Sequence, residues 1–264
     1  MDRVTREWDE AMARWVDPYE TSASAMVRLS TRPPVTLIQK RVGTLVGKRV
    51  IELGCGGGSL GLACAIRGAH ATLFDNSAPV LESAKLNLER ARPHIPGGVE
   101  VQLEQGDLLE RDFGHAFDVC LSDGLIEHWF EAAERATVLE KHLNATAPGG
   151  LVAVCIPNNA HPWMDRWERL GWPWTAEDCP LREAKITPDE LACELSAVGL
   201  KDVQVQGYMV WDTLCKWPKS RTTGLLVKGL KATLGYDRVG PIKLSEEYKR
   251  RYGTWLLGTG FAKG

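Results

Sequence analysis

The sequence lacks the features of a membrane-spanning, secreted or nucleic-acid-coating protein. No apolar run reaches the roughly 18 residues of a membrane span, and the first residues are charged and amphipathic rather than a signal peptide. Neither sign of charge dominates, because 32 Lys and Arg residues face 34 Asp and Glu residues, giving a formal net charge of -2. We therefore expect a cytoplasmic protein that binds neither nucleic acid nor membranes.

Paired cysteines are also missing. The seven cysteines are scattered along the chain without any C-x-x-C pair, which argues against both a disulfide framework and a zinc site. Most of them lie inside apolar runs, where a free thiol packs as a small hydrophobic group. We expect no bound metal ion.

From Lys48 onward, strand-like runs alternate with helix-like ones. This alternation is typical of a parallel sheet covered by helices on both faces, so we predict an α/β, doubly wound, seven-stranded, mostly parallel sheet. The predicted strands are Arg49–Leu53, Ala71–Asp75, Glu100–Glu104, Phe117–Ser122, Leu151–Ile156, Val203–Val210 and Thr254–Ala262. The predicted helices between them are Leu60–Arg67, Ala78–Ala91, Glu131–Ala147 and Pro188–Val198, the last with Thr187 as N-cap.

We expect one domain of residues 1–264. Three of its segments lie outside the alternating strands and helices. Residues 1–34 form a predicted helical cap, with an amphipathic helix at Asp2–Trp15 and another piece at Ser22–Arg32; a helix at Val35–Val46 leads into the first strand. Residues 157–186 form a tryptophan-rich insertion, and residues 211–253 a basic one. Long insertions at a sheet edge are often lids or binding elements. The assembly is expected to be a monomer or a homodimer.

The first strand ends in a glycine-rich turn that leads into a helix. After Val50 and Ile51 come an acidic residue, Glu52, and four glycines between Gly54 and Gly58. Glycine suits positive φ angles and the close approach of a ligand, and the free N–H groups at the start of the next helix suit an electron-rich ligand. The stretch is therefore a candidate ligand loop.

Taken alone, this loop does not identify its cofactor. The residues from Gly56 to Gly61 also satisfy G-x-G-x-x-G, the dinucleotide fingerprint of nicotinamide and flavin enzymes. That interpretation leaves Glu52, Asp107 and the last two strands without a role. Taken singly, Asp75 and Asp107 are each also explained as capping residues of a helix or a turn.

Four features taken together resemble the class I S-adenosylmethionine-dependent methyltransferases. They are the glycine loop and the acidic residues Asp75, Asp107 and Asp123, each at or just after the end of a predicted strand. The glycine loop resembles motif I of that family. The resemblance implies that Asp75 holds both ribose hydroxyls, that Asp107 contacts the adenine amino group, and that the turn at Asp123 lines the methionine part of the cofactor. The implied cofactor is S-adenosyl-L-methionine, and its implied binding residues are Glu52, Gly54, Cys55, Gly56, Gly58, Asp75, Asn76, Asp107, Leu108, Ser122, Asp123 and Gly124.

Glu127 and His128 follow the fourth strand and are the candidate catalytic residues. A histidine at the rim of the crevice suits deprotonation of a phenol, hydroxyl or amine; the alternative is that His128 only packs the first turn. The pair resembles that of quinone-precursor O-methyltransferases, some of which bind a divalent metal nearby. Here the upstream acid, Asp123, is offset by one residue from that pattern.

Aromatic residues supply the candidate acceptor site. The topology gathers tryptophans and a tyrosine around the crevice, which favours a flat aromatic, hydrophobic or cationic small molecule. Tryptophans at helical spacing, such as Trp163 and Trp167, also serve to pack a core or a lid. The candidate acceptor-binding residues are Trp15, Tyr19, Trp129, Trp163 and Trp167.

Other functions remain open for this sequence. The basic insertion, with Lys249, Arg250 and Arg251, is either a solvated face or a docking surface for an RNA or protein acceptor. A third hypothesis is a non-catalytic cofactor-binding subunit.

Overall fold

The computed structural model describes residues 21–162, 164, 182–209 and 245–264. The predicted helix Asp2–Trp15, most of the tryptophan-rich insertion and most of the basic insertion lie outside these residues. Helix α11 (Glu246–Tyr252) belongs to the end of the basic insertion. Among the described residues, no helix combines the length and the apolar character that a membrane span requires.

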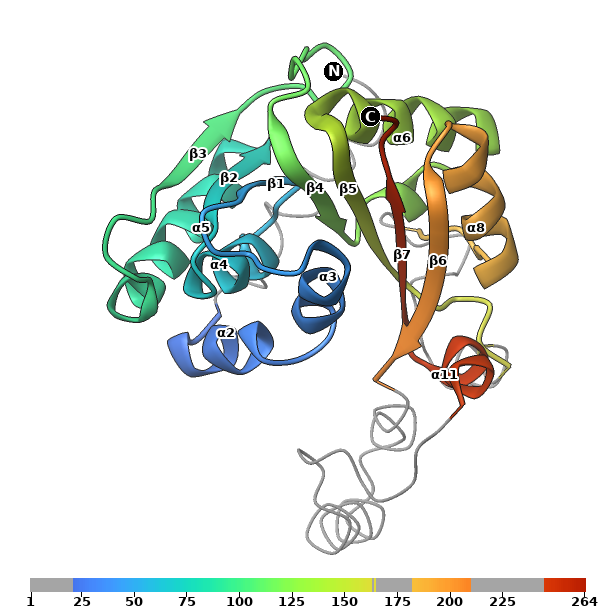
Figure 1. The fold of residues 1–264 in the computed structure, drawn as a ribbon, viewed down its shortest axis with the longest axis horizontal. Helices are drawn as coiled ribbons and strands as arrows, with labels where there is room; N and C mark the ends of the chain where they lie inside the picture. The colour runs from blue at the N-terminus through green and yellow to red at the C-terminus, as the bar shows by residue number, and fades with distance from the viewer. Residues whose placement is uncertain (1–20, 163, 165–181, 210–244) are drawn as a thin grey trace, which may run out of the picture.

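The described strands form one twisted sheet of seven strands (Figure 1). Their order is β3-β2-β1-β4-β5-β7-β6; β1 to β5 pair in parallel, and β7 lies antiparallel between β5 and β6. The predicted doubly wound, mostly parallel α/β fold is confirmed. The strands are β1 (Arg49–Leu53), β2 (His70–Asp75), β3 (Val101–Gln105), β4 (Phe117–Asp123), β5 (Thr146–Pro157), β6 (Lys201–Tyr208) and β7 (Trp255–Phe261).

Helices cover both faces of the sheet, and β5 shows why. Its residues Leu151, Ala153 and Cys155 pack with α3 and α4, while Val152, Val154 and Ile156 pack with α6 and α8. A strand buried on both faces is hydrophobic at every position. Figure 1 shows α2 to α5 on one side and α6 and α8 on the other. The helices are α2 (Ala23–Ser30), α3 (Val35–Val42), α4 (Ser59–Ile66), α5 (Ala78–Ala91), α6 (Ala132–Ala145) and α8 (Pro188–Ala197), with short 3₁₀ turns η1 (Arg92–His94) and η2 (Ile126–His128).

Element boundaries differ from the sequence predictions at a few ends. Helix α3 ends at Val42 rather than Val46, because Gly43 adopts a φ of 79° and leaves the helical region. Strand β5 begins at Thr146, where the predicted helix was still expected to continue. The predicted N-cap of α8 is confirmed, since the Thr187 side chain accepts a hydrogen bond from the Glu190 N–H.

Candidate active site

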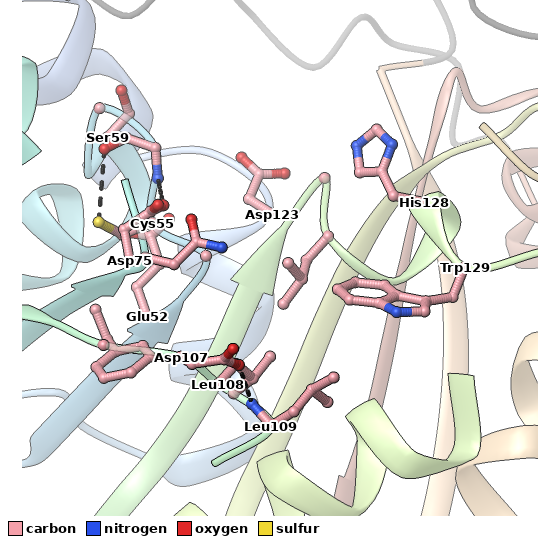
Figure 2. A pocket seen from close by; sticks show the side chains of 18 residues that line it. Glu52, Cys55, Ser59, Asp75, Asp107, Leu108, Leu109, Asp123, His128 and Trp129 are labelled. Atoms are coloured by element: carbon pink, nitrogen blue, oxygen red, sulfur yellow. Dashed lines mark hydrogen bonds between the residues drawn. The ribbon is translucent and has the colours of Figure 1, made fainter. Parts of the chain in front are cut away.

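A cavity opens where β1, β2 and β4 end at the carboxyl edge of the sheet, the edge at which open α/β sheets bind ligands. Its empty volume, with the open mouth included, is about 970 Å³. Figure 2 shows its side chains. Its lining comprises Glu52, Gly54, Cys55, Gly56, Gly57, Ser59, Phe74, Asp75, Asn76, Gly106, Asp107, Leu108, Leu109, Asp123, Gly124, Leu125, His128 and Trp129.

The glycine loop lies directly against the turn that follows β4. Gly54 has a φ of +61°, and a Cβ atom at this position would lie 2.5 Å from Cδ1 of Leu125. Real Cβ atoms do not approach other atoms so closely, so a side chain at residue 54 would displace Leu125. Glycine at position 54 thus allows the loops after β1 and β4 to meet.

Asp75 connects the glycine loop to the next helix. One carboxylate oxygen accepts a hydrogen bond from the Gly56 N–H over 2.9 Å, and the other accepts one from the Ser77 N–H over 3.0 Å. Ser77 itself holds the N-cap position of α5. The carboxylate therefore fixes two backbone turns at the mouth of the cavity.

Asn87 holds the same loop from behind. It is fully buried in α5; its Nδ2 donates to the Gly57 carbonyl over 2.9 Å, and its Oδ1 accepts from the Thr21 N–H over 2.8 Å. The Thr21 hydroxyl also lies 3.0 Å from the Ser59 hydroxyl. The chain that leads into α2 is thereby attached to the glycine loop.

Three carboxyl groups surround the loop. Glu52 is buried and accepts a hydrogen bond from the Gly61 N–H over 2.8 Å. Burial raises the pKa of Glu52, the Gly61 hydrogen bond opposes this shift, and the charges of Asp123 and Asp75 add to it. Asp123 is exposed to the cavity, but the protein around its carboxyl raises its pKa to about 6. Such a group of acids attracts a cation.

The end of the cavity around Asp107 lies beside an aromatic pair, Phe74 and Phe113. The Asp107 carboxylate accepts a hydrogen bond from the Leu109 N–H over 2.9 Å, which closes a tight turn after β3. Phe74 packs edge-to-face on Phe113, with ring centroids 5.1 Å apart. A Cβ at Gly106 would come within 3.0 Å of the Phe74 ring, so the chain passes directly over this ring. The end combines an aromatic wall with a carboxylate.

His128 and Trp129 form the opposite wall. They end the 3₁₀ turn η2 and begin the chain that leads into α6. Figure 2 places both across the cavity from Glu52 and Asp75, with Asp123 between the two sides. We call His128 and Trp129 the acceptor wall. The sequence features that we assigned to the cofactor do not include these two residues.

Three predicted site residues do not line the cavity: Gly58, Ser122 and Glu127. Gly58 is the N-cap of α4 and faces Leu73. Glu127 is 1% exposed, and no described residue hydrogen-bonds its carboxyl oxygens. Burial raises the pKa of Glu127, and the charges of Glu183 and Asp123 raise it further. The predicted Trp15, Tyr19, Trp163 and Trp167 lie outside the described residues.

Ser122 serves the core instead. Its hydroxyl lies 2.9 Å from Nε2 of His142 in α6, and Nδ1 of this histidine lies 2.9 Å from the Val138 carbonyl. Because Nδ1 must donate to that carbonyl, Nε2 accepts the serine proton and the ring is neutral. Burial lowers the pKa of His142 to about 4. The pair stabilises the strand that ends in Asp123.

Sequence reasoning missed several lining residues: Gly57, Ser59, Phe74, Gly106, Leu109 and Leu125. Gly57 and Ser59 lie inside or beside the recognised glycine loop, so the motif itself could have included them. Phe74, Leu109 and Leu125 adjoin predicted cofactor-binding residues but look like ordinary core residues. Among the described residues, no cluster of three or more His, Cys, Asp or Glu side chains is arranged to hold a metal ion.

Comparison with known proteins identifies the family. Residues 50–150 match a family profile described as a methyltransferase domain. The ubiquinone biosynthesis O-methyltransferase of Marinobacter nauticus is 35% identical over 218 residues, which cover 78% of this chain and 85% of that protein. The corresponding enzyme of Bordetella pertussis is 28% identical over 203 residues, which cover 74% of this chain and 78% of that enzyme.

Solved structures show the same fold. The S-adenosylmethionine-dependent methyltransferase SibL superposes with a TM-score of 0.57 at 17% identity, over 91% of this chain and 57% of SibL. Phosphoethanolamine N-methyltransferase 2 of Haemonchus contortus, solved with S-adenosyl-L-methionine, gives a TM-score of 0.53 at 15% identity, over 94% of this chain and 59% of that protein. The glycine run is thus a methyltransferase motif rather than a dinucleotide fingerprint. The chain belongs to the class I S-adenosylmethionine-dependent methyltransferases.

Proposed function

We propose that this enzyme methylates a hydroxyl group on a small aromatic acceptor, with His128 as the general base. The observation that carries the proposal is that His128 and Trp129 line the same cavity as Asp75, Asp107 and Asp123. The names of the Marinobacter and Bordetella relatives, ubiquinone biosynthesis O-methyltransferases, support an oxygen atom on an aromatic ring as the methyl acceptor.

The residues present fit S-adenosylmethionine. The aromatic wall of Phe74 and the Asp107 carboxylate suit an adenine ring, and Asp75 at the end of β2 suits the ribose hydroxyls. Asp123, which is ionised above its pKa of about 6, would attract the positively charged groups of the cofactor. Gly54, Gly56 and Gly57 line the cavity with backbone alone, because they carry no side chains.

When bound, S-adenosylmethionine supplies an electrophilic methyl group on a positively charged sulfur. His128 would accept the proton of the acceptor hydroxyl as that oxygen takes the methyl group and the sulfur leaves as a neutral thioether. Asp123 would contribute by attracting the positively charged cofactor into the cavity. Trp129, 9% exposed, would hold the flat acceptor by stacking. Catalysis otherwise depends on aligning the two reactants away from bulk water.

Replacing His128 by Ala tests the base role. We expect kcat on a catechol acceptor to fall roughly 100-fold or more, while the Kd for S-adenosylhomocysteine stays within about twofold, because the predicted cofactor-binding residues lie on the other side of the cavity. His94→Ala is the matched control, since His94 is exposed beyond the end of α5. Unchanged turnover of the His128 variant would contradict the base role.

A docking surface for RNA or protein has less support from the described part of the basic insertion. Lys249 pairs with Glu246 over 2.7 Å, and Arg250 pairs with Asp189 over 2.5 Å. The Arg251 guanidinium lies over the Tyr252 ring, 5.5 Å from its centroid. The two ion pairs offset the charges of Lys249 and Arg250, whereas Arg251 keeps its charge. Salt-sensitive RNA binding by the whole chain would favour this second function.

A further inference from the structure

Arg135 links two helices to the backbone of the acceptor wall. It lies in α6 with only 8% of its surface exposed. Its Nη1 donates to the carbonyl oxygens of Trp129 over 3.0 Å and Phe130 over 2.6 Å. Its Nε and Nη2 donate to the Glu194 carboxylate of α8, the shortest distance being 2.5 Å. One side chain thus joins α6, α8 and the chain after η2.

This arrangement requires arginine. A buried guanidinium is costly unless its charge is paired and its N–H groups are bonded, and Glu194 supplies the opposite charge. The planar fork of arginine reaches a carboxylate on one edge and two carbonyls on another, whereas lysine carries a single compact ammonium. The position therefore combines charge pairing with fixed geometry.

The same stretch of backbone is bound from a second direction. The Ala184 N–H donates to the Glu127 carbonyl over 2.7 Å, and the Arg182 guanidinium lies 5.0 Å from the centroid of the Phe130 ring. The carbonyls of residues 127, 129 and 130 are therefore all bound by groups from outside the turn. A turn whose carbonyls are bound in this way keeps its side chains in a fixed direction.

From these contacts we propose that Arg135 is a positioning residue that fixes the acceptor wall. Its hydrogen bonds within the described residues go to Trp129, Phe130 and Glu194, and none goes to the glycine loop. Its effect should therefore fall on the acceptor side of the cavity and spare the cofactor side. The catalytic part of this inference rests on the proposed function, since it takes His128 and Trp129 to face the acceptor.

The test compares four variants of the full chain: Arg135→Gln, Arg135→Lys, Glu194→Gln and the control Arg250→Gln. The control also removes an arginine that pairs with a carboxylate of α8, Asp189, but this arginine lies in α11, and its hydrogen bond within the described residues goes to Asp189 rather than to the acceptor wall. For each variant we would measure backbone hydrogen exchange, the Kd for S-adenosylhomocysteine, and KM and kcat for catechol. Thermal unfolding would show that each variant is folded.

For Arg135→Gln we expect faster exchange confined to residues 127–130, a rise of about tenfold in the KM for catechol, and a Kd for S-adenosylhomocysteine within about twofold. Arg135→Lys should behave similarly, because lysine cannot hold both carbonyls and Glu194. Glu194→Gln should be milder, since the two carbonyl bonds remain. The control should match the unmodified chain.

Two outcomes would overturn the inference. Unchanged exchange at residues 127–130 would show that Arg135 does not fix the wall. A parallel loss of stability, cofactor affinity and acceptor affinity would indicate a purely structural residue. If the unmodified chain turns over no catechol, the proposed function fails on its own, and the exchange rates still decide whether Arg135 holds the wall.

Discussion

The side chain of Asn87 donates a hydrogen bond to the carbonyl of Gly57 over 2.9 Å, although 30 positions separate the two residues. Helix α5 thus carries the residue that holds the cofactor loop from behind, and the same amide binds the Thr21 N–H. The loop owes its shape to a buried amide as much as to its own glycines.

Asn87→Ala should weaken cofactor binding. It would remove the hydrogen bonds to the Gly57 carbonyl and the Thr21 N–H, at a cost of about 2 kcal/mol in the free energy of unfolding, and should raise the Kd for S-adenosylhomocysteine on the order of tenfold. Asn144→Ala is the control, because Asn144 also binds a backbone N–H, that of Phe113, but at the end of α6. Equal Kd values for both variants, measured by calorimetry, would contradict this role.

Gly54→Ala should disturb the cavity more than its backbone angle alone explains. Gly47 has a similar positive φ of 72° but no atom within 4 Å of its Cβ position, whereas a Cβ at residue 54 meets Leu125. Gly47→Ala should cost about 1 kcal/mol, and Gly54→Ala roughly 1 to 3 kcal/mol more, with loss of cofactor binding. Denaturant unfolding of both variants measures the difference; similar values would rule out the steric explanation.

Cofactor binding should depend on pH through Asp123. Because the pKa of Asp123 is raised to about 6, its carboxyl is neutral below that pH and ionised above it. Attraction to a sulfonium therefore appears as the pH rises from 5 to 7, and the affinity for S-adenosylmethionine should increase on the order of tenfold. S-adenosylhomocysteine, whose sulfur is neutral, should change less. In Asp123→Asn, the two ligands should show the same pH profile.

Acid should destabilise the fold through His142. The unfolded chain protonates this histidine near its ordinary pKa of 6.5, whereas the folded chain does so only near 4. Between these values the unfolded state binds the extra proton, so the free energy of unfolding should fall by roughly 3 kcal/mol as the pH drops from 6.5 to 4. His142→Gln should flatten this slope, and His94→Gln at an exposed position should not. An unaltered slope in His142→Gln would assign the acid sensitivity to other groups.

Sequence patterns were sufficient to place the cavity residues that lie at the ends of strands. Asp75, Asp107 and Asp123 end or follow strands, and parallel strands bring their carboxyl ends to one edge, so their meeting could be predicted. Glu127 and His128 could not be separated in this way. Successive residues of a 3₁₀ turn point about 120° apart, so one lines the cavity and the other is buried beneath it.

Other residues shape the cavity or its supports without any recognisable sequence pattern. Phe74 and Leu125 resemble any core residue until the fold brings a glycine against each of them. Arg135 acts through backbone carbonyls, which every residue possesses, so its role depends wholly on where α6 and η2 lie. The cavity residues at the strand ends could thus be predicted from motifs, whereas the contacts that hold His128 and Trp129 required the structure.

The antiparallel β7 has a consequence for the synthesis of the chain. Strand β6 leaves the ribosome before β7, yet in the described sheet β7 separates it from β5. Until residues 255–261 emerge, β6 has no neighbour to pair with, and β5 presents an open edge. The sheet therefore cannot be completed before β7 has been synthesised. A chain stalled before Trp255 would expose an unpaired β6 and the open edge of β5, a state that invites aggregation or capture by chaperones.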